Sequence, residues 1–192
     1  DEFDIKHLSW YQLTIEKNTI FNRTPPKLPD EIILECTESL GESRIADMGL
    51  EHYEISAFAE PGHEAYHNLN YWKFGDYLGI GAGAHGKVTI GENIFRTTRT
   101  RHPTHYLKRI KTSCNSNIID KEQVGLECLM NGLRLKSGIS HRAFEERTNL
   151  NAQVFRENQL KRAMELNLIE ENRFQATTFG WRHLNTLLQM LI

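Results

Sequence analysis

The chain has 192 residues, of which 39% are hydrophobic and 25% are charged, and its formal net charge is -2. This composition is ordinary for a globular protein, and the charge excludes a general attraction to nucleic acid or anionic lipid. No apolar run approaches the roughly 20 residues that span a bilayer, so the sequence also excludes a transmembrane segment.

The first predicted element is a strand over residues 7–16, because apolar and polar side chains alternate along it. Its polar face carries Gln12, Thr14 and Glu16. Side chains that point into a barrel near strand ends usually belong to a site, so these three are candidate site residues. The chain enters this strand almost at once, which predicts that upstream residues are missing.

A helix is predicted after a proline-rich loop. Asp30 is a suitable N-cap, and Ile33, Cys36 and Leu40 then repeat at helical spacing. Gly49 is a suitable residue to end this helix, because glycine adopts the left-handed conformation without strain.

Two further strands are predicted, over residues 53–58 and residues 76–81. The order of strand, helix and strand favours parallel strands joined by a right-handed crossover. The first half of the chain therefore predicts an α/β fold.

The second half of the chain has a helical character. The predicted elements are helices over residues 121–135, 140–147 and 151–167, a short hairpin over 168–177 and a closing helix over 180–192. Ser140 and Asn151 are the expected caps of the second and third helices. This order resembles a winged helix, and the polar stretch 112–117 predicts a division into residues 1–113 and 114–192.

The three cysteines, Cys36, Cys114 and Cys128, are odd in number and far apart. This pattern argues against a disulfide framework and favours a reducing, cytoplasmic location. Their spacing fits no metal site, so each is interpreted as a small buried apolar side chain.

Three sequence blocks occur in a characteristic order, at residues 53–62, 67–72 and 76–85. They resemble the C-terminal half of the oxygen-independent coproporphyrinogen III oxidase-like radical S-adenosylmethionine proteins. The block from His67 to Trp72 resembles the HNxxYW element of the HemW-type haem chaperone branch. The resemblance covers essentially the whole chain. It implies the C-terminal part of a partial (β/α) barrel, followed by a small winged-helix-like α+β domain.

His67 is followed closely by two aromatic residues, Tyr71 and Trp72. A neutral imidazole can ligate haem iron, and the aromatic rings offer a flat apolar surface to a macrocycle. The alternative is that His67 caps a loop while Tyr71 and Trp72 fill the core. The resemblance implies the haem site, with His67 as iron ligand and Asn68, Tyr71 and Trp72 beside it.

Gly79, Gly81 and Gly83 precede Ala84 and His85. A dinucleotide fingerprint is incomplete here, because its third glycine is absent. The glycines allow a tight turn or close approach of a ligand to the backbone, and the alternative is that they serve packing alone. The resemblance implies that this loop borders the cavity for S-adenosylmethionine and substrate, with His85 as a wall residue. We assign the polar strand face to the same cavity.

Residues 93–119 contain no acidic residue. Arg96, Arg99 and Arg101 are candidate ligands for an anion such as a porphyrin propionate, a phosphate or a protein carboxylate. The same stretch also holds His102, His105, Lys108, Arg109 and Lys111. The alternative interpretation is a solvated basic face.

The resemblance implies that the parent protein binds a [4Fe-4S] cluster through a CxxxCxxC loop, together with S-adenosylmethionine and haem or a porphyrin. The three cysteines do not match that loop, so this chain supplies no cluster ligands and is expected to be inactive by itself in cleaving S-adenosylmethionine. Two functions compete: haem binding and delivery to an acceptor protein, or oxidative decarboxylation of coproporphyrinogen. The HNxxYW element favours the first, with haem as the ligand of this chain.

A winged helix also raises the alternative of DNA binding. Residues 114–192 hold ten Lys or Arg and nine Asp or Glu, a balance of 10 - 9 = +1. This is a poor match to a phosphate backbone. The sequence therefore favours a structural or protein-contact role for this domain and no nucleic-acid partner.

Overall fold

The computed structural model describes residues 4–108 and 114–192. The chain forms two compact units, which we call unit 1 (residues 1–65) and unit 2 (residues 66–192). The division predicted between residues 113 and 114 adjoins residues outside the described ranges and stays a prediction. In the described part of the chain, every helix is too short or too polar to cross a membrane.

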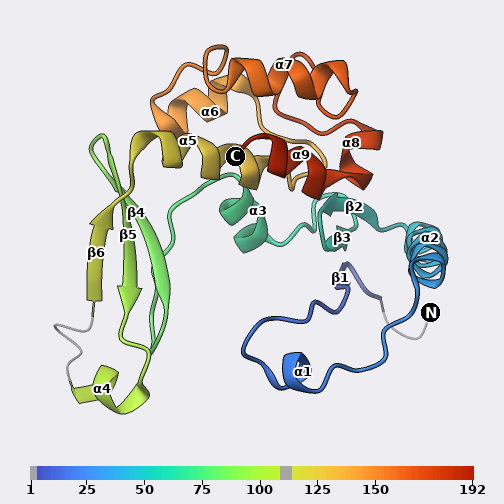
Figure 1. Cartoon of the computed structure of the whole chain (residues 1–192), viewed down its shortest axis with the longest axis horizontal. Helices are drawn as coiled ribbons and strands as arrows, with labels where there is room; N and C mark the ends of the chain where they lie inside the picture. Colours follow the sequence, from blue (N-terminus) through green and yellow to red (C-terminus); the bar gives the residue numbers. More distant parts are fainter. Residues whose placement is uncertain (1–3, 109–113) are drawn as a thin grey trace. The chain divides into compact units, whose positions relative to one another are not determined.

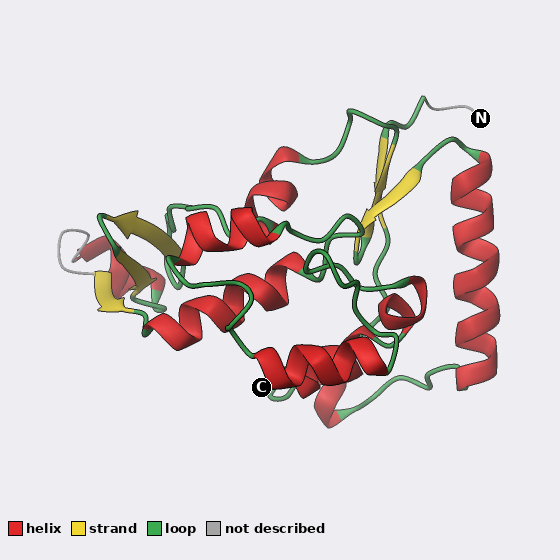
Figure 2. Ribbon diagram, turned by 90° about the horizontal axis from the view of Figure 1, so that it is seen from above, coloured by secondary structure: helices red, strands yellow, loops and turns green. Residues whose placement is uncertain are grey.

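In its described residues, 4–65, unit 1 contains one small antiparallel sheet and two helices (Figure 1). Its elements are β1 (His7–Ser9), α1 (Ile20–Arg23), α2 (Glu31–Asp47), β2 (Glu51–Glu54) and β3 (Ala57–Ala59). The strand order is β1-β3-β2, and both neighbouring pairs are antiparallel. Figure 2 shows α2 along its length.

Helix α2 confirms the predicted helix but not its predicted apolar face. The Asp30 carboxylate accepts a hydrogen bond from the Ile33 backbone N–H at 2.9 Å, and Gly49 has φ 77° beyond the helix end. The side chains of Ile33, Cys36 and Leu40 are nevertheless exposed. This helix packs within unit 1 through other residues.

The packing face of α2 is marked by a glycine. A Cβ on Gly41 would lie 1.9 Å from the indole ring of Trp10, so only glycine lets the helix approach that ring. One turn further, Ile45 is buried in a small cluster with Leu50 and Phe58. These contacts, four residues apart, define the side of the helix that is covered.

The strands of unit 1 correct two sequence predictions. The predicted strand over residues 7–16 ends at Ser9, so Gln12, Thr14 and Glu16 are exposed outside any strand. Its partner β3 has only three residues, which limits the length of the ladder.

The predicted strand over residues 53–58 is interrupted by a turn at residues 55 and 56, which separates β2 from β3. The predicted parallel pairing is therefore wrong. Strands β1 and β2 run in the same direction, but β3 lies between them and pairs antiparallel with both. The tight turn places β3 next to β2, and this position excludes a direct pairing of β1 with β2.

Unit 2 combines a second antiparallel sheet with seven helices in the part of the chain that is described. Its elements are α3 (Tyr66–Trp72), β4 (His85–Ile90), β5 (Asn93–Arg99), α4 (Pro103–Lys108), β6 (Cys114–Ile118), α5 (Lys121–Gly132), α6 (His141–Thr148), α7 (Glu157–Glu165), α8 (Thr178–Arg182) and α9 (Leu184–Met190). Strands β4, β5 and β6 lie side by side in this order (Figure 1). The mixed α/β class is confirmed.

The sheet of unit 2 was not predicted from the sequence, although Gly91 and Glu92 mark its first hairpin turn. The predicted strand over residues 76–81 is instead irregular, with a single antiparallel bridge between Tyr77 and Lys87. The strand does not continue beyond this bridge, because the backbone leaves the extended conformation at Gly81 and Gly83, whose φ angles are positive.

The helical half follows one of its two predicted caps. The Ser140 hydroxyl accepts a hydrogen bond from the Ala143 N–H at 3.1 Å at the start of α6. The predicted cap at Asn151 is wrong: its side chain accepts hydrogen bonds from the N–H groups of residues 153 and 154 in a turn before α7, and the helix begins only at Glu157, after Arg156 with φ 52°. As a consequence Val154, which was expected to face inward, is exposed.

The closing helix is divided at His183 into α8 and α9. The predicted hairpin over residues 168–177 is reduced to a bridge between Ile169 and Ala176.

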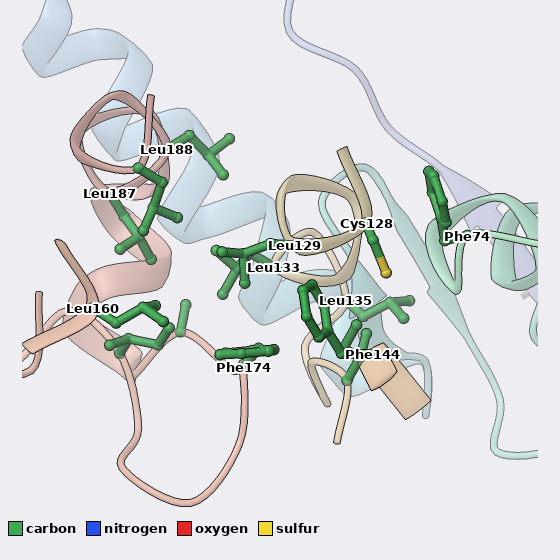
Figure 3. Close-up of a cluster of buried hydrophobic side chains, with 14 of the residues drawn as sticks. Phe74, Cys128, Leu129, Leu133, Leu135, Phe144, Leu160, Phe174, Leu187 and Leu188 are labelled. Atoms are coloured by element: carbon green, nitrogen blue, oxygen red, sulfur yellow. The ribbon is translucent and has the colours of Figure 1, made fainter. Parts of the chain in front are cut away.

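The main core lies in unit 2 and is built mostly by the helices after residue 119 (Figure 3). Leu129 of α5, Phe144 of α6 and Leu187 of α9 are completely buried. Phe174, from the segment that follows α7, meets Phe144 edge to face with ring centroids 5.1 Å apart. Burial of these side chains is the main source of stability for unit 2.

We predict that Leu129→Ala lowers the free energy of unfolding by about 2–5 kcal/mol, because it removes buried methyl groups and leaves a cavity. Leu107→Ala is the matched control, since Leu107 in the same unit is 67% exposed. Urea unfolding of both variants measures the difference. Equal unfolding midpoints for the two variants would contradict the assigned core.

Candidate functional site

Helix α3 has a packed side and an open side. Leu69 and Trp72, three residues apart, pack against the core of unit 2. His67 and Tyr71, four residues apart, lie on the exposed side. Within residues 4–108 and 114–192, no group forms a hydrogen bond with the His67 ring, so both ring nitrogens are open to a ligand.

Aromatic rings gather around the end of α3. The ring centroids of Tyr71 and Trp72 are 5.1 Å apart in an edge arrangement, and those of Tyr71 and Tyr77 are 5.6 Å apart. Both separations lie in the range that favours aromatic contact. We call Tyr71, Trp72 and Tyr77 the aromatic cluster. It joins two predicted site residues to Tyr77, which was not predicted as a site residue.

The loop after α3 is held by the ammonium group of Lys87, a β4 residue that is only 3% exposed. This group donates hydrogen bonds to the Phe74 carbonyl at 2.9 Å and to the Asp76 carboxylate at 3.2 Å. It also lies 4.0 Å from the centre of the Phe74 ring. Burial lowers the pKa of Lys87, and the hydrogen bond with Asp76 opposes that shift.

The Asp76 carboxylate also binds Thr89, which lies two residues after Lys87 in β4. It accepts hydrogen bonds from the Thr89 N–H at 2.7 Å and from the Thr89 hydroxyl at 2.9 Å. Burial by itself raises the pKa of Asp76, but the hydrogen bonds from Thr89 and Lys87 together outweigh it and lower the pKa below its ordinary 3.8. Asp76, Lys87 and Thr89 thus connect the end of α3 to β4.

This network predicts a pH dependence of stability. The folded-state pKa of Asp76 is depressed, so its contribution is present above about pH 3.8 and is lost as the pH falls through the folded-state value. Asp76→Asn should therefore lower the free energy of unfolding near neutral pH, with a difference from wild type that shrinks in acid. Urea unfolding across pH measures this, with exposed Glu171→Gln as control. A difference that stays constant down to about pH 2 would contradict the prediction.

The segment of residues 78–84, which we call the glycine loop, packs closely on the strands of unit 2. A Cβ on Gly79 would lie 2.3 Å from the His85 carbonyl oxygen, and Gly83 has φ 74°. The Gly83 N–H donates to the Thr100 carbonyl at 2.9 Å, and the Ala84 carbonyl accepts from the Arg99 N–H at 2.8 Å. At these positions glycine serves both conformation and packing.

The outer surface of the same loop is apolar. Leu78 and Ile80 are 78% and 82% exposed. Between Ile80 and Ala82, Gly81 has φ 107° and its N–H donates to the Tyr106 hydroxyl at 3.3 Å. His85 is exposed at the first position of β4.

The three predicted anion ligands have different surroundings. Arg96 is ion-paired with Glu127, so its charge is compensated within the protein. The Arg99 Nε donates to the Gly79 carbonyl at 3.2 Å, and the backbone of Arg101 lies beside Gly83. Arg99 and Arg101 therefore flank the glycine loop. Of the remaining basic stretch, Arg109 and Lys111 lie outside the described residues.

The structure adds Arg134, which was not predicted as a site residue. Its guanidinium carbon lies 5.6 Å from the centre of the Trp72 ring, and one terminal nitrogen donates to the Met130 carbonyl at 2.8 Å. Burial lowers the pKa of Arg134, and Tyr71 acts in the opposite direction. A signal existed in the sequence, because Arg134 is the charged residue in the largely apolar run 129–135.

The candidate residues Gln12, Thr14 and Glu16 belong to unit 1 and are exposed. The cavity that we predicted them to share with the glycine loop stays a prediction.

The cysteines have three different environments. Cys128 is completely buried, and burial raises the pKa of its thiol to about 12. Cys114 is half-buried, whereas Cys36 is exposed on α2 and corrects the expectation that all three are buried. In the described ranges, no group of three or more His, Cys, Asp or Glu side chains could hold a metal ion.

We predict that iodoacetamide labels Cys36 in the native protein near pH 8 and leaves Cys128 unlabelled, because alkylation needs an accessible thiolate. Peptide mass spectrometry identifies the labelled residue. In denaturant both cysteines should react, which provides the control. Native labelling of Cys128 at the rate of Cys36 would contradict its burial.

Known proteins show similarity along the whole chain. Residues 119–183 match the family described as HemN C-terminal domain. The chain is 41% identical to the haem chaperone HemW of Escherichia coli, with 100% of the chain and 51% of that protein aligned. It is 42% identical to the haem chaperone HemW of Haemophilus influenzae, with 100% of the chain and 50% of that protein aligned.

The fold is also similar to that of a solved structure, coproporphyrinogen III oxidase (HemN) from Escherichia coli, described as a radical SAM enzyme. The TM-score is 0.62 at 14% identity, over 85% of this chain and 42% of the other. The chain spans about half the length of the two HemW proteins.

Proposed function

The chain belongs to the HemW family of haem chaperones, and we propose that unit 2 binds haem at the open side of α3. The observation that carries this proposal is the exposed His67 imidazole, one helical turn from the aromatic cluster. A histidine nitrogen is a common axial ligand of haem iron, and the macrocycle packs on flat apolar surface; α3 offers both groups.

The ligand atom would be a nitrogen of His67. Its ring has no hydrogen-bond partner in the described part of the chain, so ligation would break no hydrogen bond there. Tyr71, which is 44% exposed, would contact the macrocycle. Asn68 and Trp72 would hold α3 in position, because each is half-buried on the helix.

The glycine loop would form a second boundary of the bound ligand. Exposed Leu78 and Ile80 offer apolar contacts, and Arg99 and Arg101 place positive charge at the two ends of the loop. Arg96 contributes less to anion binding, because Glu127 balances its charge. We assign Gly79, Gly81, Gly83, Ala84 and His85 to the wall of a cavity for substrate and S-adenosylmethionine.

For the whole protein we propose a haem chaperone that delivers haem to an acceptor protein, as the name of the two bacterial relatives suggests. A [4Fe-4S] cluster and S-adenosylmethionine would belong to that protein. The described residues of this chain do not fit the cluster, since they hold no suitable group of metal ligands. A cytoplasmic location is part of the proposal and rests on the free cysteines.

The finer features of the fold are part of the same proposal. Unit 1 and the glycine loop would contribute to the partial (β/α) barrel. Residues 114–192 would form the winged-helix-like domain. The family match over residues 119–183 supports a distinct C-terminal domain that begins near this point.

We predict that His67→Ala raises the dissociation constant for haem about a hundredfold, which corresponds to a ligand bond worth about 2.8 kcal/mol. The Soret band should shift or broaden, because an axial nitrogen is lost. Haem titration of the chain, followed by absorbance, measures both effects. His105→Ala is the matched control, since His105 is an exposed helical histidine of the same unit.

Unchanged affinity and spectrum in His67→Ala would refute ligation by His67. The competing function, oxidation of coproporphyrinogen, predicts this result, because that substrate contains no iron to ligate. Circular dichroism of the variant separates a lost ligand from a lost fold.

A further inference from the structure

Among the described residues of unit 2, three of the six buried or half-buried lysine and arginine side chains have an acidic partner. Lys87 binds Asp76, Arg96 binds Glu127, and Arg156 binds Glu122 at 2.8 Å. These pairs follow the expected rule, because an uncompensated charge away from water is costly.

Arg99, Arg173 and Arg134 have no ion pair among the described residues, and of these three Arg134 is the one that lies over a ring of the aromatic cluster. It is half-buried, and it forms no ion pair with any carboxylate in the described ranges 4–108 and 114–192. Its hydrogen bond with the Met130 carbonyl uses one of the five N–H donors of a guanidinium. Burial also lowers the pKa of Arg134, because removal from water disfavours the charged form of the guanidinium.

The position of Arg134 suggests which kind of ligand would accept hydrogen bonds from its remaining N–H donors. Its guanidinium lies over the Trp72 ring, 5.6 Å from the centre, and Trp72 contacts Tyr71 of the open side of α3. A ligand that covered the aromatic cluster would thus meet a partly desolvated cation at its edge. Such a ligand is flat, apolar and negatively charged at its margin.

We infer that Arg134 binds a carboxylate side chain of the tetrapyrrole and thereby orients it on the aromatic cluster. This inference rests on the proposed haem binding and adds the group that recognises the acidic edge of the ligand. The planar fork of arginine fits a carboxylate through two parallel hydrogen bonds, and the low polarity beside Trp72 strengthens them. Arg134 is therefore a specificity residue, distinct from the iron ligand.

The test compares haem with its dimethyl ester, which keeps the iron and the macrocycle but has no ionised carboxylates. The wild-type chain should bind haem at least about tenfold more tightly than the ester, as expected for loss of a charge-assisted hydrogen bond. Arg134→Met should weaken haem binding by at least about tenfold and change binding of the ester by less than about twofold.

Arg142→Met is the matched control, because Arg142 is an exposed arginine of α6 that is paired with Glu146. It should leave both affinities unchanged. Arg134→Lys should fall between wild type and Arg134→Met, since lysine keeps the charge but loses the fork. An equal loss for haem and ester in Arg134→Met would assign Arg134 a purely structural role and overturn the inference.

The two proposals fail in distinguishable ways. If the wild-type chain binds neither ligand, the proposed haem site is wrong. If it binds haem and ester equally and Arg134→Met changes neither affinity, only the role of Arg134 is wrong. The ratio of the two wild-type affinities tests the inference even where a variant does not fold.

Discussion

The buried ammonium group of Lys87 is the interaction on which the candidate site depends. A cation that is 3% exposed must be compensated, and the Phe74 carbonyl, the Phe74 ring and Asp76 provide this compensation. Because Phe74 and Asp76 follow α3 and Lys87 lies in β4, the same contacts determine where α3 ends. The orientation of His67 and Tyr71 follows from that end point.

The two sides of α3 then have separate tasks. Leu69 and Trp72 are half-buried and pack against the core, and this packing stabilises the helix, which has only seven residues. The opposite side is left open, with an imidazole and a phenol one turn apart. A short helix can present such groups reliably only because its packed side is supported by a large core.

Charge compensation distinguishes structural cations from candidate binding cations in unit 2. Lys87, Arg96 and Arg156 have carboxylate partners and hold elements together. Arg99 and Arg134 use only part of their donors on backbone carbonyls. Basic residues close in sequence thus differ in function, and the difference lies in the partners that folding brings to them.

The sequence by itself determined the helices with clear caps, such as those after Asp30 and Ser140, because a cap acts within one turn of the chain. Its motif around His67 also predicted the family correctly. Only the tertiary structure decided the antiparallel order of β1, β3 and β2, which depends on contacts between distant residues. It also decided that Arg134 lies beside Trp72, because 61 intervening positions separate them and only packing of the helices brings them together.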